Sequence, residues 1–100
     1  MAFEKGKVRK NNVLLEAIDF AIDTALSWEG TYPKVDKGDY IVIIENDFEG
    51  ETTPVLVSRR YTSPENHEEA AEIALDAYNE RKGYRGGSSV RVVRVDAVMK

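Results

Sequence analysis

The sequence predicts a protein of the α+β class with the element order α-β-β-α-β. Residues Tyr40–Ile44 form an uninterrupted run of large apolar side chains that is too short for a buried helix and rich in β-branched residues. Two longer segments, 13–28 and 64–82, instead repeat apolar residues at the spacing of an amphipathic helix. The segment 90–98 is rich in valine. We therefore expect two helices packed with a small, mainly antiparallel, three-stranded sheet.

Composition limits the classes of function. The chain has 100 residues, of which 42% are hydrophobic and 32% are charged, and its formal net charge is −4. This balance suits one globular domain, and the mild acidity argues against sequence-independent binding of nucleic acid over the whole surface. The absence of cysteine excludes disulfides and thiolate zinc sites. With no signal peptide and no apolar run of about 18 residues, we expect a cytoplasmic protein. No cofactor or metal motif is present in the sequence, so we expect neither.

The N-terminal segment 1–11 is expected to be a basic tail, followed by a single α+β domain over 12–100. Two interpretations of this tail stay open. It is either a solvated, partly mobile segment or a basic arm that contacts phosphate or an acidic partner. Its cations are Lys5, Lys7, Arg9 and Lys10.

The first helix is predicted over 13–28. Asn12 has the side chain of an N-cap residue, and Gly30 follows the last apolar position. Pro33 cannot continue a helix, so the chain is expected to leave it as a loop.

The central strand is predicted over Asp39–Glu45 because apolar side chains would point to both of its faces. A second strand is predicted over 53–62, joined to the first by a polar, glycine-containing turn as a β-hairpin. Pro54 and the Arg59–Arg60 pair favour an edge position for this second strand.

The second helix is predicted to begin with Ser63 as N-cap and Pro64 in the first helical position, and to end at Gly83. Its buried stripe is rich in alanine, which indicates that the helix lies close to the sheet. The third strand, 90–98, carries valine on both faces, so we expect a bulge or a partly covered second face. The sheet order 2-1-3 places the Tyr40–Ile44 run at the centre. A third strand parallel to the second is the alternative.

The sequence contains no constellation of catalytic residues, so we expect a protein that is not an enzyme. His67 is the only histidine, no cysteine is present, and an exposed surface role is expected for His67. The acidic stretch Glu45–Glu51 has some spacing in common with a calcium loop, but Leu56 stands where the bidentate glutamate is required.

The second helix carries a continuous line of carboxylates, here called the acidic ridge. Like charges at helical spacing destabilise a helix, so the ridge has either a solubilising role or a binding role. In the binding interpretation it meets a basic, nucleic-acid-binding surface of another protein. The residues of the acidic ridge are Glu65, Glu69, Glu72, Asp76 and Glu80.

Two further surfaces are predicted. If both helices cover the same face of the sheet, an apolar patch stays exposed and favours a homodimer or another partner contact; its residues are Ile41, Ile43 and Leu56. The alternative function is a nucleic-acid-binding module that uses the basic arm and the strand arginines. Its residues are Lys5, Lys7, Arg9, Lys10, Arg59, Arg60, Arg85, Arg91 and Arg94.

The predicted hairpin is followed by Ser63-Pro-Glu65 and Glu69-Ala-Ala-Glu72, then by Tyr78, and finally by the valine-rich Val90–Val95. In this succession the segment 40–98 resembles small accessory proteins of phages and mobile elements, among them some anti-CRISPR inhibitors. The resemblance implies a non-enzymatic binding protein that acts in the host cytoplasm by contact with another protein. The first helix is not part of the resemblance. The resemblance assigns no function to any individual residue.

Overall fold

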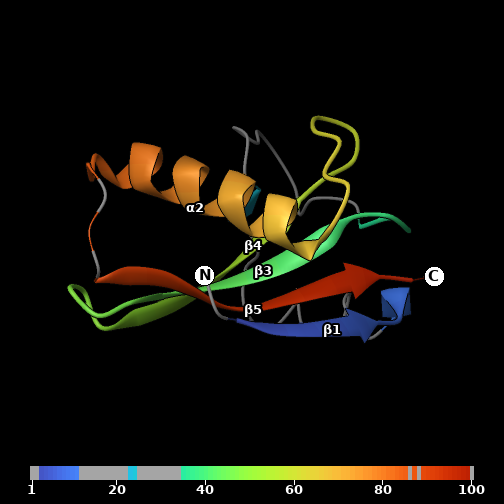
Figure 1. Ribbon diagram of the computed structural model, residues 1–100, viewed down its shortest axis with the longest axis horizontal. Helices are drawn as coiled ribbons and strands as arrows, with labels where there is room; N and C mark the ends of the chain where they lie inside the picture. Colours follow the sequence, from blue (N-terminus) through green and yellow to red (C-terminus); the bar gives the residue numbers. More distant parts are fainter. Residues whose placement is uncertain (1–2, 12–22, 25–34, 86, 88, 100) are drawn as a thin grey trace.

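A computed structural model describes residues 3–11, 23–24, 35–85, 87 and 89–99 of the chain, and these form an α+β fold (Figure 1). The strands are β1 (Glu4–Val8), β2 (Asp23–Thr24), β3 (Tyr40–Asn46), β4 (Glu51–Val57) and β5 (Val90–Val98). They form one mixed sheet in the order β1-β5-β3-β4-β2. The helix α2 (His67–Lys82) lies across one face of this sheet.

The strand β3 lies at the centre of the sheet, as predicted from its uninterrupted apolar run. It pairs antiparallel with β4 on one side and with β5 on the other, which confirms the predicted neighbours. Its side chains are buried on both faces: Val42 and Ile44 under α2, and Ile41 on the opposite face. This double coverage explains why β3 does not alternate between apolar and polar residues.

A bulge in β5 confirms the irregularity predicted for that strand. Ile43 pairs with Arg94 and Ile44 pairs with Val92, so Val93 is an extra residue. Val92 and Val95 would face opposite sides of a regular strand, but with the extra residue both pack in the core beneath α2.

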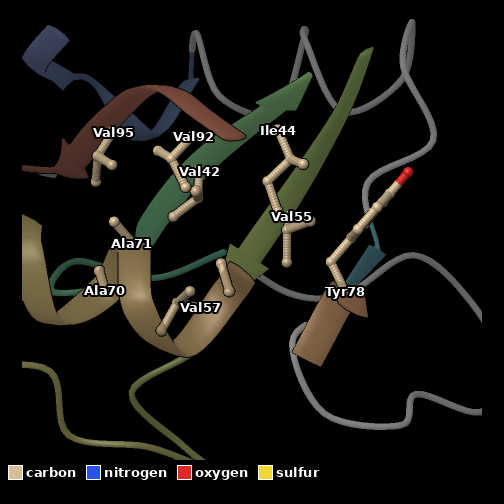
Figure 2. Close-up of a cluster of buried hydrophobic side chains, with 10 residues drawn as sticks. Val42, Ile44, Val55, Val57, Ala70, Ala71, Tyr78, Val92 and Val95 are labelled. Carbon is tan, nitrogen blue, oxygen red and sulfur yellow. The ribbon is translucent and has the colours of Figure 1, made fainter. Parts of the chain in front are cut away.

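The core beneath α2 is built from valines and isoleucine of the sheet and small residues of the helix (Figure 2). Ala70, Ala71 and Ala74 are buried against the sheet, which confirms that alanine brings the helix close. A second, smaller core lies on the other face of the sheet and consists of Val35, Ile41, Leu56 and Val98.

The segment predicted as a basic tail contains a strand. Residues Glu4–Val8 of β1 pair parallel with β5, from Glu4 beside Arg94 to Val8 beside Val98. Phe3 packs against the core beneath α2, whereas Val8 packs against the second core. The exposed lysines of β1 are typical of an edge strand, where charge prevents further strand pairing.

The predicted first helix, 13–28, falls mostly outside the described residues. Within it, Asp23–Thr24 form β2 and pair parallel with Val55 and Leu56 of β4, so this part of the helix prediction is wrong. The prediction of β4 as an edge strand is corrected for the same reason. The strand β4 also ends at Val57 rather than at Thr62.

The helix α2 begins later than predicted. Its N-cap is Asn66, whose side chain accepts a hydrogen bond from the backbone N–H of Glu69, rather than Ser63. Asparagine is at least as good a cap as serine, and Asn66 lies next to the first helical residue. The predicted C-terminal end is confirmed, because Gly83 adopts the left-handed conformation with φ 76°.

Candidate functional site

The richest polar site lies where the turn between β3 and β4 meets the C-terminal end of α2 (Figure 1). Asn46, the last residue of β3, is buried, and its Nδ2 lies 3.1 Å from the hydroxyl of Tyr78 and 3.2 Å from that of Tyr84. Its Oδ1 accepts the backbone N–H of Glu49 at 3.1 Å, which closes the turn. One asparagine thus joins the hairpin to the helix and to the loop that follows the helix.

Two tyrosine–carboxylate pairs surround this asparagine. Tyr78 donates to Glu51 and Tyr84 donates to Glu49, each at 2.5 Å. The Nζ of Lys82 lies 3.1 Å from Glu49 Oε2 and 3.0 Å from Glu51 Oε1, and so it bridges the two carboxylates. We refer to Asn46, Glu49, Glu51, Tyr78, Lys82 and Tyr84 as the junction network.

The pKa shifts in the junction network all hold its groups in their ordinary charge states at neutral pH. Hydrogen bonds from Tyr84 and Tyr78 lower the pKa of Glu49 and of Glu51, respectively. The two carboxylates raise the pKa of Lys82, with Glu51 the larger influence. Burial raises the pKa of Tyr78, and the bond to Glu49 raises that of Tyr84. General acid–base catalysis needs a pKa near the working pH, and each of these shifts moves the pKa of its group further from neutral pH.

An exposed aromatic pair lies beside the junction network. Phe48, in the turn between β3 and β4, is 79% exposed. Its ring meets that of Tyr84 edge to face, with centroids 6.2 Å apart and planes at 77°. Next to them is a surface pocket of about 220 Å³, lined by Phe48, Asn79, Tyr84, Arg85, Gly87, Ser89 and Val90. We call this the hairpin pocket.

The acidic ridge occupies the face of α2 that points away from the sheet. Glu72, Asp76 and Glu80 are exposed, and Glu69 is half-buried. Glu65 is exposed but precedes the N-cap Asn66, so the ridge is helical only from Glu69 onward. Among the described residues, none of the five ridge carboxylates takes part in an ion pair.

Among residues 3–11, 35–85 and 89–99, the carboxylates outside the ridge form ion pairs or accept hydrogen bonds from backbone N–H groups. Each of them forms an ion pair except Asp39. Asp39 is buried and accepts the backbone N–H groups of Asp36 and Arg59 at 2.8 and 2.9 Å. The paired carboxylates are Glu4, Asp36, Glu45, Asp47, Glu49, Glu51, Glu68 and Asp96.

The basic residues proposed for nucleic acid divide into two groups. Arg91 pairs with Glu45 and Asp47, and Arg94 pairs with Glu4 and Asp96, so these strand arginines are already neutralised. Lys5, Lys10 and Arg60 are also paired: Lys5 with Glu68, and both Lys10 and Arg60 with Asp36. The others, Lys7, Arg9, Arg59 and Arg85, have no carboxylate partner among the described residues.

Several cations, some with and some without a carboxylate partner among the described residues, lie at the end of the sheet opposite to the hairpin pocket. Arg9, Lys10 and Lys37 line a wide hollow of about 630 Å³ together with Asn11 and Met99. A Cβ placed on Gly38 would lie 3.2 Å from Cδ of Arg59, so Arg59 extends alongside Gly38, the residue after Lys37. We call Arg9, Lys10, Lys37, Arg59 and Arg60 the basic corner.

The apolar patch predicted for self-association is not exposed. Ile41 and Leu56 are 3% and 0% exposed and belong to the second core, and Ile43 is half-buried against it. The predicted exposure of Ile41 and Leu56 is therefore wrong, because both side chains pack with Val35 and Val98 in the second core, whereas the homodimer stays a prediction. His67 also differs from its predicted exposed role: it is half-buried, with Nε2 3.1 Å from the carbonyl oxygen of Gly6.

The junction network and the hairpin pocket were not found from the sequence. Their members come from the hairpin turn, from the end of α2 and from the following loop, so no local spacing reveals them. One signal was present: Phe48 is a large apolar residue inside an otherwise polar turn. Such a residue either packs or marks a contact surface, and here its exposure favours the second.

Comparison of the chain with protein-family models, with curated proteins and with solved structures finds no match. The only helix that spans more than a turn or two in the described ranges, α2, is too short and too polar to cross a lipid bilayer. In those same ranges no group of histidine and carboxylate side chains is arranged to hold a metal ion.

Proposed function

We propose that this chain is a small non-enzymatic binding protein of the inhibitor type, which occupies a basic, nucleic-acid-binding surface of a partner protein with the acidic face of α2. The observation that supports the proposal is the contrast between two groups of carboxylates. Among residues 3–11, 35–85 and 89–99, those outside the ridge are neutralised by nearby cations or held by backbone N–H groups. Those on the ridge have no cation partner among the described residues, and all of them except the half-buried Glu69 are exposed.

This contrast has an electrostatic consequence. Charges that are paired within the protein contribute little field outside it, while unpaired charges of one sign on one helix face attract a partner of opposite sign. The ridge therefore directs negative charge outward from α2, and negative charge is what a phosphate-binding surface attracts. The resemblance of the segment 40–98 to accessory proteins of phages and mobile elements adds a biological setting. We propose that the partner is a CRISPR effector complex in the host cytoplasm.

The test uses the wild-type protein and two variants of equal net charge. The ridge variant carries Glu72→Gln, Asp76→Asn and Glu80→Gln. The control variant carries Glu4→Gln, Glu45→Gln and Glu68→Gln, which remove the same charge from exposed ion pairs of little energetic weight. The immobilised proteins are presented to a panel of purified CRISPR effector complexes, and the retained complex is measured at increasing salt.

We expect the wild type and the control variant to retain an effector and to block its target-DNA binding, and the ridge variant to lose both properties. Equal retention by the ridge and control variants would show that binding does not depend on the ridge. Failure of the whole panel to bind would reject the CRISPR setting, and the ridge would then be tested on other nucleic-acid-binding complexes with the same three proteins.

The alternative function, direct binding of nucleic acid, is favoured by the basic corner. Arg9, Lys37 and Arg59 are exposed and have no carboxylate partner among the described residues. Asp36 partly neutralises the corner through Lys10 and Arg60. A gel shift at low salt with DNA and RNA tests this alternative, and Arg9→Glu with Arg59→Glu should weaken any complex and reduce its salt dependence. Absence of a complex at low salt would eliminate it.

A further inference from the structure

The hairpin pocket lies at the same end of α2 as the ridge residues Asp76 and Glu80. Its walls are mostly apolar and aromatic: the exposed ring of Phe48, the ring of Tyr84 and the side chain of Val90. A concave apolar surface with a few polar groups is the usual form of a recognition pocket. The junction network holds the pocket in shape, because it fixes Tyr84 against Glu49 and Asn46.

Two side chains that line the pocket have polar atoms that form no hydrogen bond with the described residues. Oδ1 of Asn79 is buried and accepts no hydrogen bond from the described residues. Arg85, which also lines the pocket, is exposed and has no hydrogen bond or ion pair with them. Buried acceptors in folded proteins are nearly always satisfied, so an unpaired one needs an explanation. The χ2 torsion of asparagine is soft, which allows the amide of Asn79 to turn toward an entering group.

We propose that the hairpin pocket receives one apolar side chain of an extended segment of the partner protein, and that Asn79 and Arg85 bind the peptide backbone of that segment. A peptide group offers one N–H donor and one carbonyl acceptor. Asn79 accepts from the N–H through Oδ1, and the guanidinium of Arg85 donates to the carbonyl oxygen. This inference rests on the proposed function and specifies the contact through which the partner is recognised.

The charges around the pocket indicate which residues of the partner segment flank its inserted apolar side chain. The carboxylates of the ridge end and of the hairpin outnumber the cations Arg81, Lys82, Arg85 and Arg91 at this end. The segment that binds therefore carries lysine or arginine next to its apolar residue. Phe48 and Tyr84 provide the aromatic anchor, in agreement with the enrichment of aromatic residues and arginine at the centres of protein interfaces.

The experiment follows the backbone amide signals of the isotope-labelled full chain by NMR during titration with three capped tripeptides. The first, acetyl-Lys-Phe-Lys-amide, has the proposed chemistry. The second, acetyl-Lys-Gly-Lys-amide, keeps the charge and removes the apolar side chain. The third, acetyl-Glu-Phe-Glu-amide, keeps the side chain and reverses the charge. We expect millimolar binding of the first peptide alone, with shifted signals at Phe48, Asn79, Tyr84 and Val90.

The variant Asn79→Leu separates recognition from stability. Leucine has the same number of side-chain heavy atoms and the same branching, removes the unpaired acceptor and has the higher helix propensity. We expect this variant to melt at a higher temperature than the wild type and to bind acetyl-Lys-Phe-Lys-amide about tenfold more weakly, because the peptide N–H loses its acceptor. Phe48→Ser should abolish the binding without affecting the junction network.

Two results would overturn the inference. Equal signal shifts with both lysine peptides, spread along Glu72, Asp76 and Glu80, would show simple charge attraction to the ridge and no use of the pocket, and would leave the proposed function intact. Absence of shifts at Phe48, Asn79, Tyr84 and Val90 with all three peptides would exclude the pocket as a recognition site. The proposed function is tested by a different experiment, the retention of effector complexes. Equal retention by the ridge and control variants would reject the proposed function.

Discussion

Tyr78 donates its phenolic hydrogen to Oε1 of Glu51 at 2.5 Å, and this bond joins the last turn of α2 to the first residue of β4. The ring of Tyr78 belongs to the core beneath the helix (Figure 2). Its hydroxyl also accepts a hydrogen bond from Nδ2 of Asn46. One side chain therefore contributes to apolar packing and to the junction network that shapes the hairpin pocket.

The variant Tyr78→Phe tests this connection. It keeps the ring and removes both hydrogen bonds, so the buried amide of Asn46 loses one partner. We expect a loss of about 1–2 kcal/mol in the free energy of unfolding, measured by urea denaturation. Tyr84→Phe is the matched control. The hydroxyl of Tyr84 also reaches Asn46, but its two hydrogen bonds are less buried than those of Tyr78, so its removal should cost less. An unchanged unfolding midpoint for Tyr78→Phe would contradict this role.

Stability should decrease in acid. The pKa values of Glu49 and Glu51 are lowered in the folded protein by the hydrogen bonds from Tyr84 and Tyr78, and secondarily by Lys82. The unfolded chain then binds more protons than the folded one as these groups titrate. Their contribution is complete above the ordinary glutamate pKa of about 4.3 and is lost as the pH falls through the lowered values.

The variant Glu49→Gln with Glu51→Gln isolates this effect. Both carboxylates are 39% exposed, so solvent screens them and the effect should be modest. We expect the melting temperature of the variant to decrease less steeply with pH than that of the wild type in the range below about pH 4.3. Parallel curves for the two proteins would show that the junction network does not produce the acid sensitivity.

Asp39 should be among the most sensitive positions of the fold. Its buried carboxylate accepts backbone N–H groups from Asp36 and from Arg59, and so joins the turn before β3 to the end of β4. Asp39→Ala leaves both donors unpaired, and we expect a loss of about 3 kcal/mol in the free energy of unfolding. Asp36→Ala removes only ion pairs with partly exposed Lys10 and Arg60 and should have a much smaller effect. Similar losses for the two variants would contradict this difference.

Gly6 tests whether β1 belongs to the sheet. A Cβ at this position would lie 2.2 Å from Oδ1 of Asp96 and 2.6 Å from Nη2 of Arg94, two side chains already bonded to each other. Gly6→Ala should therefore destabilise the fold by about 1–3 kcal/mol and increase hydrogen exchange in β1. Lys7→Ala, at the exposed neighbouring position, should leave the exchange unchanged. Equal exchange in both variants would place β1 outside the cooperative fold.

The parts of the fold that the sequence predicted are those controlled by local patterns. The run Tyr40–Ile44 identified the central strand because a strand covered on both faces needs no polar residues, and Gly83 identified the end of α2. The strand β1 was missed because its two lysines and glycine give no periodic apolar signal; its order comes from pairing with β5 and from Phe3 and Val8 at its ends.

The candidate site was predicted only in part for a related reason. The acidic ridge follows from helical spacing alone, so its place on the outer face of α2 could be expected. The hairpin pocket depends on Phe48, Asn79 and Tyr84, which meet only when the turn after β3 closes against the end of α2. The ion pairs of Arg91 and Arg94 likewise depend on the register of neighbouring strands. The number of charged residues in the sequence does not predict that register.

The parallel pairing of β1 with β5 also determines the order in which the protein can assemble on the ribosome. Glu4 lies beside Arg94, so the partners of β1 are the last to be synthesised among the described strands. The hairpin of β3 and β4 involves short loops and can close early, whereas β1 must remain solvated until β5 has emerged. Charged lysines on β1 disfavour its pairing with strands of neighbouring chains before β5 is available. The same lysines removed the apolar signal by which β1 could have been predicted from the sequence.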